Sequence, residues 1–171
     1  MKAMIHLYCG DGKGKTTASV GLAVRAAGAG NKVRFVQFLK NGNSSELKQL
    51  KKLGIETRVC EKPHGFIWTM SEEEKTQARA DYTELLEKAF EGAQDLDLLV
   101  LDEAVGAAGC RMILEEELIR LLQEKPEGLE VVMTGRDPSE ALQAEADYIT
   151  EMKKIRHPFD KGVDARRGIE Y

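Results

Sequence analysis

A glycine-rich segment near the N-terminus restricts the possible folds of this chain more than any other feature. Residues 8–17 read YCGDGKGKTT, between an apolar run at residues 3–8 and an alanine-rich stretch at residues 18–29. A strand, a glycine loop and a helix in this order place converging backbone N–H groups and the positive end of a helix dipole around an anion. The segment therefore predicts a phosphate-binding P-loop whose helix begins near Lys15.

Two side chains of this loop suit a nucleoside triphosphate. Lys15 supplies a mobile positive charge for phosphate oxygens, and the Thr16 hydroxyl is a ligand that magnesium accepts. The usual P-loop would need a glycine at position 9, where this chain has Cys9, and the glycine follows at Gly10. We therefore expect the loop to hold phosphates differently from an ordinary ATPase. A glycine-rich turn that binds nothing is the alternative.

Apolar runs alternate with helical patterns along the rest of the chain. This alternation predicts an α/β fold with a mostly parallel sheet and helices on both faces. The length of 171 residues predicts one domain, residues 1–171. After the first strand, we expect strands at residues 33–38, 55–60, 96–101, 129–133 and 148–152. A short helix is expected at residues 44–53, and a long helix is expected to begin at Ser71, where Glu74 completes a capping box. A further helix is expected to begin after an N-cap at Asp137. Another is marked by the spacing of Leu114, Leu118, Leu121 and Leu122.

Ligands of parallel sheets bind at the carboxyl ends of the strands, which here gathers several polar segments at one edge. They are the glycine loop, residues 37–42, Asp102 with Glu103, and residues 134–136. Asp102 and Glu103 end an apolar run, an arrangement in which an acidic residue holds magnesium directly or through water, and a plain polar strand end is the alternative. Arg136 is either a ligand for a phosphate tail or an ordinary surface arginine.

Other residues with possible chemistry lie outside this predicted edge. The loop at residues 63–68 contains Phe66 and the only tryptophan, Trp68, and either binds a ligand or packs a long connection. His64 and His157 have no partners at metal-ligand spacing, so we do not expect them to bind a metal ion. The cysteines form neither a metal-binding pattern nor a disulfide framework; they are Cys9, Cys60 and Cys110.

The composition narrows the classes of partner. The net charge of −4 argues against general nucleic-acid binding, and no apolar run approaches the roughly 18 residues of a membrane span. The N-terminus lacks the pattern of a signal peptide, so we expect a cytoplasmic location. The basic stretch at residues 153–167 faces an anionic ligand, a partner subunit or solvent.

Taken together, these segments resemble the ATP:corrinoid adenosyltransferases of the P-loop type, which act on cobalamin or cobyrinic acid a,c-diamide. The resemblance covers essentially the whole chain and implies a P-loop NTPase architecture of the RecA-like kind. The shifted glycine is itself a trait of this family. The matching residues are Gly10, Asp11, Gly12, Lys13, Gly14, Lys15, Thr16 and Thr17, residues 36–40 (VQFLK), 65–68 (GFIW), 100–103 (VLDE), 134–136 (TGR), 157–162 (HPFDKG) and 168–171 (GIEY).

The resemblance implies a reaction in which cobalt(I) of the corrinoid attacks the 5′ carbon of ATP and inorganic triphosphate leaves. In the family ATP lies in the reverse sense along the P-loop, so the whole triphosphate is the leaving group. Its charge would be stabilised by residues 10–17, by magnesium on Thr16 with Glu103 or Asp102, and by Arg136. Phe66 and Trp68 match aromatic residues that crowd the lower face of the corrin and expel the axial ligand of cobalt.

The resemblance also implies partners. A reduced flavoprotein is the family's electron donor, and homodimerisation is likewise a family expectation. Some relatives carry an N-terminal helical arm that covers the partner's active site, and we do not expect that contribution from a chain that starts in the first strand. Two other functions are possible for such residues: a P-loop kinase or ATPase for small molecules, and a non-catalytic carrier of corrinoid or nucleotide.

Overall fold

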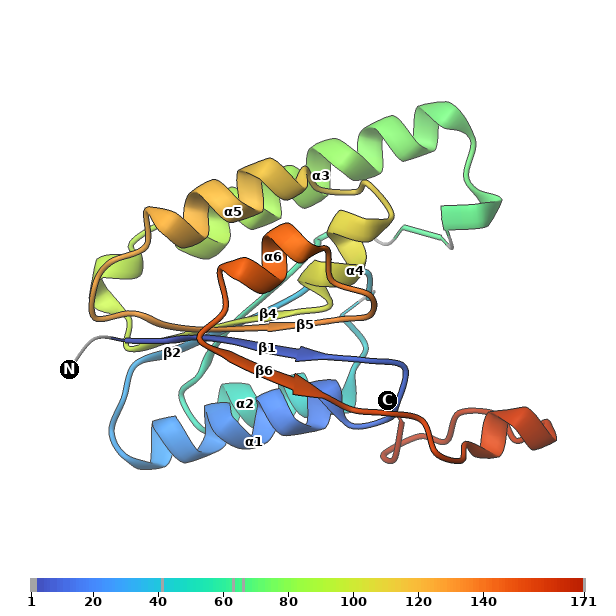
Figure 1. Ribbon diagram of the computed structural model, residues 1–171, viewed down its shortest axis with the longest axis horizontal. Helices are drawn as coiled ribbons and strands as arrows, with labels where there is room; N and C mark the ends of the chain where they lie inside the picture. Colours follow the sequence, from blue (N-terminus) through green and yellow to red (C-terminus); the bar gives the residue numbers. More distant parts are fainter. Residues whose placement is uncertain (1–2, 41, 63, 66, 171) are drawn as a thin grey trace.

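The computed structural model describes residues 3–40, 42–62, 64–65 and 67–170 and contains a six-stranded sheet (Figure 1). Each strand is parallel to its neighbours, in the order β3-β2-β4-β5-β1-β6. The predicted α/β fold with a parallel sheet is therefore confirmed. The strands are β1 (Ile5–Cys9), β2 (Val33–Gln37), β3 (Glu56–Val59), β4 (Leu98–Asp102), β5 (Glu130–Thr134) and β6 (Tyr148–Glu151).

Helices cover both faces of the sheet, as the alternation of strands and helices predicts. One face carries α1 (Lys15–Gly28) and α2 (Ser45–Lys52), as Figure 1 shows. The other face carries the remaining four helices, which are α3 (Glu72–Phe90), α4 (Ala104–Gly109), α5 (Glu115–Gln123) and α6 (Glu140–Ala144). Among the described residues, none of the helices combines the length and the apolar character that a bilayer crossing requires.

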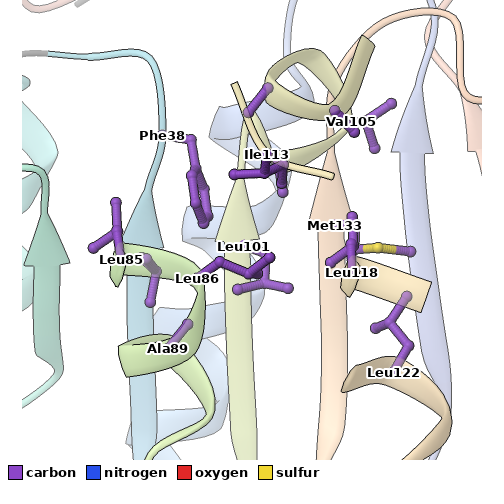
Figure 2. Packing of buried hydrophobic residues seen from close by; sticks show 14 of the residues in the cluster. Phe38, Leu85, Leu86, Ala89, Leu101, Val105, Ile113, Leu118, Leu122 and Met133 are labelled. Atoms are coloured by element: carbon purple, nitrogen blue, oxygen red, sulfur yellow. The ribbon is translucent and has the colours of Figure 1, made fainter. Parts of the chain in front are cut away.

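The hydrophobic core forms two clusters, one on each face of the sheet. The central strands β2 and β4 are buried along their whole length. This burial explains why residues 98–101 of β4 are all apolar, whereas β2 also buries the polar side chains of Arg34 and Gln37. Edge strand β6 is exposed at all four positions. Figure 2 shows the larger cluster, in which side chains of α3 and α5 pack over the strands; they are Leu85, Leu86, Ala89, Leu118 and Leu122 against Leu101 and Met133.

The capping box predicted for the long helix is present at the start of α3. The Ser71 N–H donates to Glu74 Oε2 at 2.7 Å, and the Glu74 N–H donates to Ser71 Oγ at 3.2 Å. These two bonds satisfy backbone donors that the first turn of a helix leaves free. The helix therefore begins where the sequence pattern places it.

The N-cap predicted at Asp137 is wrong. Helix α6 is capped two residues later by Ser139, whose Oγ accepts from the Leu142 N–H at 3.1 Å. Asp137 instead has a positive φ of 47°, outside the extended region that an N-cap residue normally adopts. Ser139 also donates to Glu115 Oε1 at 2.8 Å, which ties the start of α6 to α5.

Candidate nucleotide site at the carboxyl ends of the strands

A cavity of about 260 Å³ lies at the carboxyl ends of the strands. It brings together the glycine loop with segments that follow β2, β4 and β5, as predicted for a parallel sheet. The C-terminal segment contributes further residues that the sequence analysis did not place there. The lining consists of residues 11–17, Lys40, Glu103, Arg136, His157, Ile169 and Glu170.

The glycines of the loop are required by a close backbone approach. Gly10 has φ +102°, and a Cβ atom added at Gly10 or at Gly12 would lie 2.5 Å from the carbonyl oxygen of Met152. The Gly12 N–H donates to that same oxygen at 2.6 Å. Gly14 has φ +116° and forms the N-cap of α1. The segment after β6 thus packs directly against the loop, so that no side chain fits at positions 10 and 12.

Asp11 fastens the loop to the same segment. Its Oδ1 accepts from the backbone N–H of Lys154 at 2.8 Å. This hydrogen bond to the ionised form lowers the pKa of Asp11. The Asp11 side chain therefore helps to set the shape of the loop.

Lys15 folds back onto its own loop. Its Nζ donates to the carbonyl oxygens of Gly10 and Gly12, both at 2.8 Å, and the residue is only 7% exposed. Burial lowers the pKa of Lys15, and Arg136 lowers it further, while Glu103 opposes the change. The ammonium group is thus held by two neutral oxygens, which phosphate oxygens can replace with a gain of charge complementarity.

Asp102 is a fully buried carboxylate at the end of β4 on which neighbouring strands converge. Its Oδ2 accepts from Lys40 Nζ and from Gln37 Nε2, each at 3.0 Å. Its Oδ1 accepts from Thr134 Oγ1 at 2.8 Å. Three donors, from β2, the loop after β2 and β5, satisfy this buried charge and fix its position.

Glu103 follows in a left-handed conformation, with φ 60°. Its N–H donates to Thr134 Oγ1 at 2.9 Å, and its side chain lines the cavity. Burial raises the pKa of Glu103, and Asp102 raises it further, while Lys40, Lys15 and Arg136 oppose the rise. Glu103 is therefore a partly desolvated carboxylate that faces several cations and has capacity for another ligand.

Lys40 occupies a position between two of the predicted magnesium ligands. Its Nζ lies 3.4 Å from Thr16 Oγ1 and 3.0 Å from Asp102 Oδ2. A hydroxyl and a carboxylate converging on one positive charge form a donor set that suits a hard cation. Sequence reasoning placed residues 37–42 at this edge but did not choose Lys40, because a strand-end lysine carries no spacing signal of its own.

His157, Ile169 and Glu170 were also missed as lining residues. They come from the C-terminal segment, whose basic character suggested an anionic ligand without identifying which residues would face it. Glu170 is bonded to Arg166, with Oε1 accepting from Nη2 at 3.0 Å. This hydrogen bond, together with others from Arg166, holds the pKa of Glu170 down at about 2.

The aromatic loop lies apart from this cavity. Trp68 belongs to a 3₁₀ turn at Ile67–Thr69, is 79% exposed and is not among the residues that line the cavity. The turn precedes α3 and lies beyond the carboxyl end of the sheet in Figure 1. Phe66 falls outside the described residues. Of the predicted site residues, Thr17 and Arg136 do line the cavity, with Arg136 exposed at its wall.

Comparison with known proteins places these residues in a family. Residues 1–171 match the family described as ATP:corrinoid adenosyltransferase BtuR/CobO/CobP. The corrinoid adenosyltransferase of Escherichia coli (strain K12) is 34% identical over 171 residues, which cover 99% of this chain and 86% of that protein. The one from Sinorhizobium sp is 35% identical over 179 residues, covering 99% and 81%. Corrinoid adenosyltransferase CobA of Salmonella typhimurium (strain LT2) is 34% identical over 171 residues, covering 99% and 86%.

Proposed function

The chain belongs to the ATP:corrinoid adenosyltransferases and is a transferase, and we propose that its reaction takes place at the cavity formed by residues 11–17, Lys40, Glu103 and Arg136. The enzyme transfers the 5′-deoxyadenosyl group of ATP to cobalt(I) of a corrinoid. The observation that supports this location is the convergence of a P-loop, the partly buried carboxylate of Glu103 and four cationic side chains on one cavity. Those side chains are Lys13, Lys15, Lys40 and Arg136.

In the proposed reaction the electron pair of cobalt(I) forms a bond to the 5′ carbon. The bond from that carbon to the triphosphate oxygen breaks, and its electron pair leaves with inorganic triphosphate. Negative charge therefore grows on the triphosphate in the transition state. We propose that Lys15, Lys13 and Arg136 stabilise that charge, and their presence in the lining of the cavity supports this role. Gly10, Gly12 and Gly14 contribute the shape of the loop rather than a charge.

Thr16, Asp102 and Glu103 are proposed to hold the magnesium ion that accompanies ATP. Magnesium would supply Lewis-acid stabilisation to the phosphate oxygens. Asp102 is already fixed by three donors, while Glu103 projects into the cavity with its pKa raised by burial. Glu103 is therefore the carboxylate with the greater freedom to become a ligand. Lys40 compensates the charge of Asp102 and donates a hydrogen bond to the Thr16 hydroxyl.

Phe66 and Trp68 are proposed to contact the corrinoid. The exposed indole of Trp68 supports this role, since a large aromatic side chain that is 79% exposed presents apolar surface to a flat apolar ligand. Its separation from the triphosphate cavity is consistent with two substrates that bind side by side. A reduced flavoprotein donor and a homodimer are proposed on the family expectation alone, and a cytoplasmic location is proposed on the N-terminal sequence pattern.

An anaerobic assay tests this function. The protein is mixed with magnesium ATP and chemically reduced cob(I)alamin or cob(I)yrinic acid a,c-diamide, the visible spectrum is followed, and inorganic triphosphate is measured. We expect the light-sensitive adenosyl product and one triphosphate per product. Formation of ADP and phosphate would instead support a kinase or ATPase. Tight corrinoid binding with intact ATP would support a carrier, and the better of the two corrinoids identifies the preferred substrate.

A further inference from the structure

Three side chains of types that can bind metal ions lie close together between the end of β3 and helix α3, away from the nucleotide cavity. They are Cys60, His64 and Asp81, and each offers one ligand atom within 4.8 Å of the other two. The sequence analysis expected neither the cysteines nor His64 to bind a metal, because their spacing matches no ligand pattern. The fold brings them together since Asp81 lies on α3, which packs over the strand that Cys60 follows.

Two atoms of this cluster are buried without a hydrogen-bond partner in the described structure. His64 Nε2 and Asp81 Oδ2 lie 3.0 Å apart, but their geometry does not make a hydrogen bond. The side chains are 10% and 12% exposed. Buried polar atoms without hydrogen bonds are costly and uncommon, so two that face each other at ion-pair distance indicate a place where a further group can bridge both.

The surroundings orient the cluster in the way that metal ligands usually are. Asp81 Oδ1 accepts from Gln77 Nε2 at 2.9 Å and from Lys62 Nζ at 3.3 Å, which leaves Oδ2 directed at His64. The His64 ring packs against Tyr82, with ring centroids 5.4 Å apart. Such outer contacts hold ligands in position before an ion arrives.

We propose that Cys60, His64 and Asp81 form a binding site for a divalent transition-metal ion of the zinc class. A thiolate and an imidazole favour zinc and its neighbours over magnesium or calcium. Three protein ligands leave a fourth tetrahedral position for water or an exogenous ligand. The ion can enter from solvent, because Cys60 and Asp81 line a cavity of about 470 Å³ and His64 lines a second one of about 300 Å³.

A bound ion would link the segment after β3 to α3. That segment continues into the 3₁₀ turn that carries Trp68, so the ion would anchor the start of the aromatic loop. Among described residues, the cavities at this cluster share no lining residue with the nucleotide cavity. Metal binding here therefore requires neither ATP nor corrinoid. It can be tested independently of the proposed reaction.

The test is metal binding by the ligand-free full chain. Chelator-treated protein is titrated with Zn²⁺ by calorimetry, and with Co²⁺ salt as an absorption probe in the absence of corrinoid. We expect one equivalent of either ion and a thiolate-to-cobalt charge-transfer band. Cys60→Ser should abolish that band, while His64→Gln and Asp81→Asn should weaken Zn²⁺ binding by about tenfold or more.

Cys110→Ser is the matched control, because Cys110 Sγ donates to Ala107 O at 3.5 Å next to a different helix and lies outside the cluster. This variant should keep both the stoichiometry and the band. X-ray absorption of the zinc-loaded parent, which needs no variant, should show one sulfur ligand. The proposal is overturned if the parent binds no Zn²⁺, if Cys60→Ser binds it as tightly as the parent, or if no sulfur is found.

Discussion

At the scale of single residues, Lys15 has the most direct connection to triphosphate. It is buried and bonded to two loop carbonyls, so it is already positioned before ATP binds. We expect Lys15→Ala to lower kcat/KM by about a hundredfold or more, since the loss of one preorganised donor has that size. Calorimetric ATP affinity and steady-state rates provide the measurement, with the exposed Lys48→Ala as a control. Near-normal ATP affinity in Lys15→Ala would contradict the proposed role.

Glu103 gives a prediction with a defined pH dependence. Because burial raises its pKa, the ionised form opposes folding of the free protein. Below the ordinary glutamate value of 4.5 the carboxyl is protonated in both states and makes no difference. As pH rises from 4.5 through the raised pKa, the ionised carboxylate lowers the free energy of unfolding, and this loss of stability is complete above the raised pKa. We therefore expect Glu103→Gln and the parent to melt alike near about pH 4, and the variant to melt higher at neutral pH.

The same substitution should weaken the response to magnesium. If Glu103 is a ligand, the magnesium concentration for half-maximal activity should increase by about tenfold or more in Glu103→Gln. A magnesium titration that does not change would assign the ligand role to Asp102.

The role of Trp68 can be tested by comparing two forms of the corrinoid substrate. Trp68→Ala should reduce activity with a cobalt(II) corrinoid plus reductant much more than with prereduced cobalt(I), because only the former needs its axial ligand expelled. The melting temperature should barely move, since the side chain is 79% exposed. Rates with both substrates and a thermal melt of the variant are the measurements. Equal losses with both substrates would argue against the axial-ligand role.

At the scale of elements, the junction between the glycine loop and the segment after β6 is the most constrained part of the site. Gly12→Ala would place a methyl group 2.5 Å from the Met152 oxygen, and we expect it to destabilise the chain by about 1–3 kcal/mol and to abolish ATP binding. Gly21→Ala is the matched control within α1, where no atom lies within 4 Å. That control should be stabilised by about 1 kcal/mol. Denaturant unfolding distinguishes the two, and equal stability would contradict the close approach.

Helices and strands could be predicted from the sequence where the interactions that form them join residues close together in the chain. Buried parallel strands and the capping box at Ser71 leave signals within a few residues, and these predictions are confirmed. The cap at Asp137 failed because Ser139 competes for the same role nearby. Helix α4 was not predicted, because Gly106 and Gly109 lie within its six residues and weaken any helical pattern.

The site was predictable in part for the same reason. The P-loop and the Asp102–Glu103 pair are local motifs, whereas the contact between Asp11 and Lys154 joins residues 143 positions apart. The same holds for the C-terminal residues of the cavity and for the cluster around His64, whose members are brought together only by the packing of α3. No local pattern in one sequence records such contacts.

At the scale of the whole molecule, the prediction of one domain has a thermodynamic test. If residues 1–171 fold as one unit, calorimetry should show a single cooperative transition. Magnesium ATP should shift that transition upward as its concentration increases, because it binds only the folded chain. Lys15→Ala should unfold in one transition that ATP shifts much less. Two resolved transitions in the parent would contradict a single domain.

The position of β1 in the sheet has a consequence for how the chain is made on the ribosome. β1 lies between β5 and β6, and the Met4 N–H pairs with Glu130, 126 residues later. At typical rates of about 5–20 residues per second, β1 waits on the order of ten seconds after its synthesis for its neighbours. The glycine loop waits longer, because the Met152 and Lys154 backbone groups that shape it are translated after β6. The nascent chain thus acquires its nucleotide site only after residues 152–154 have been translated.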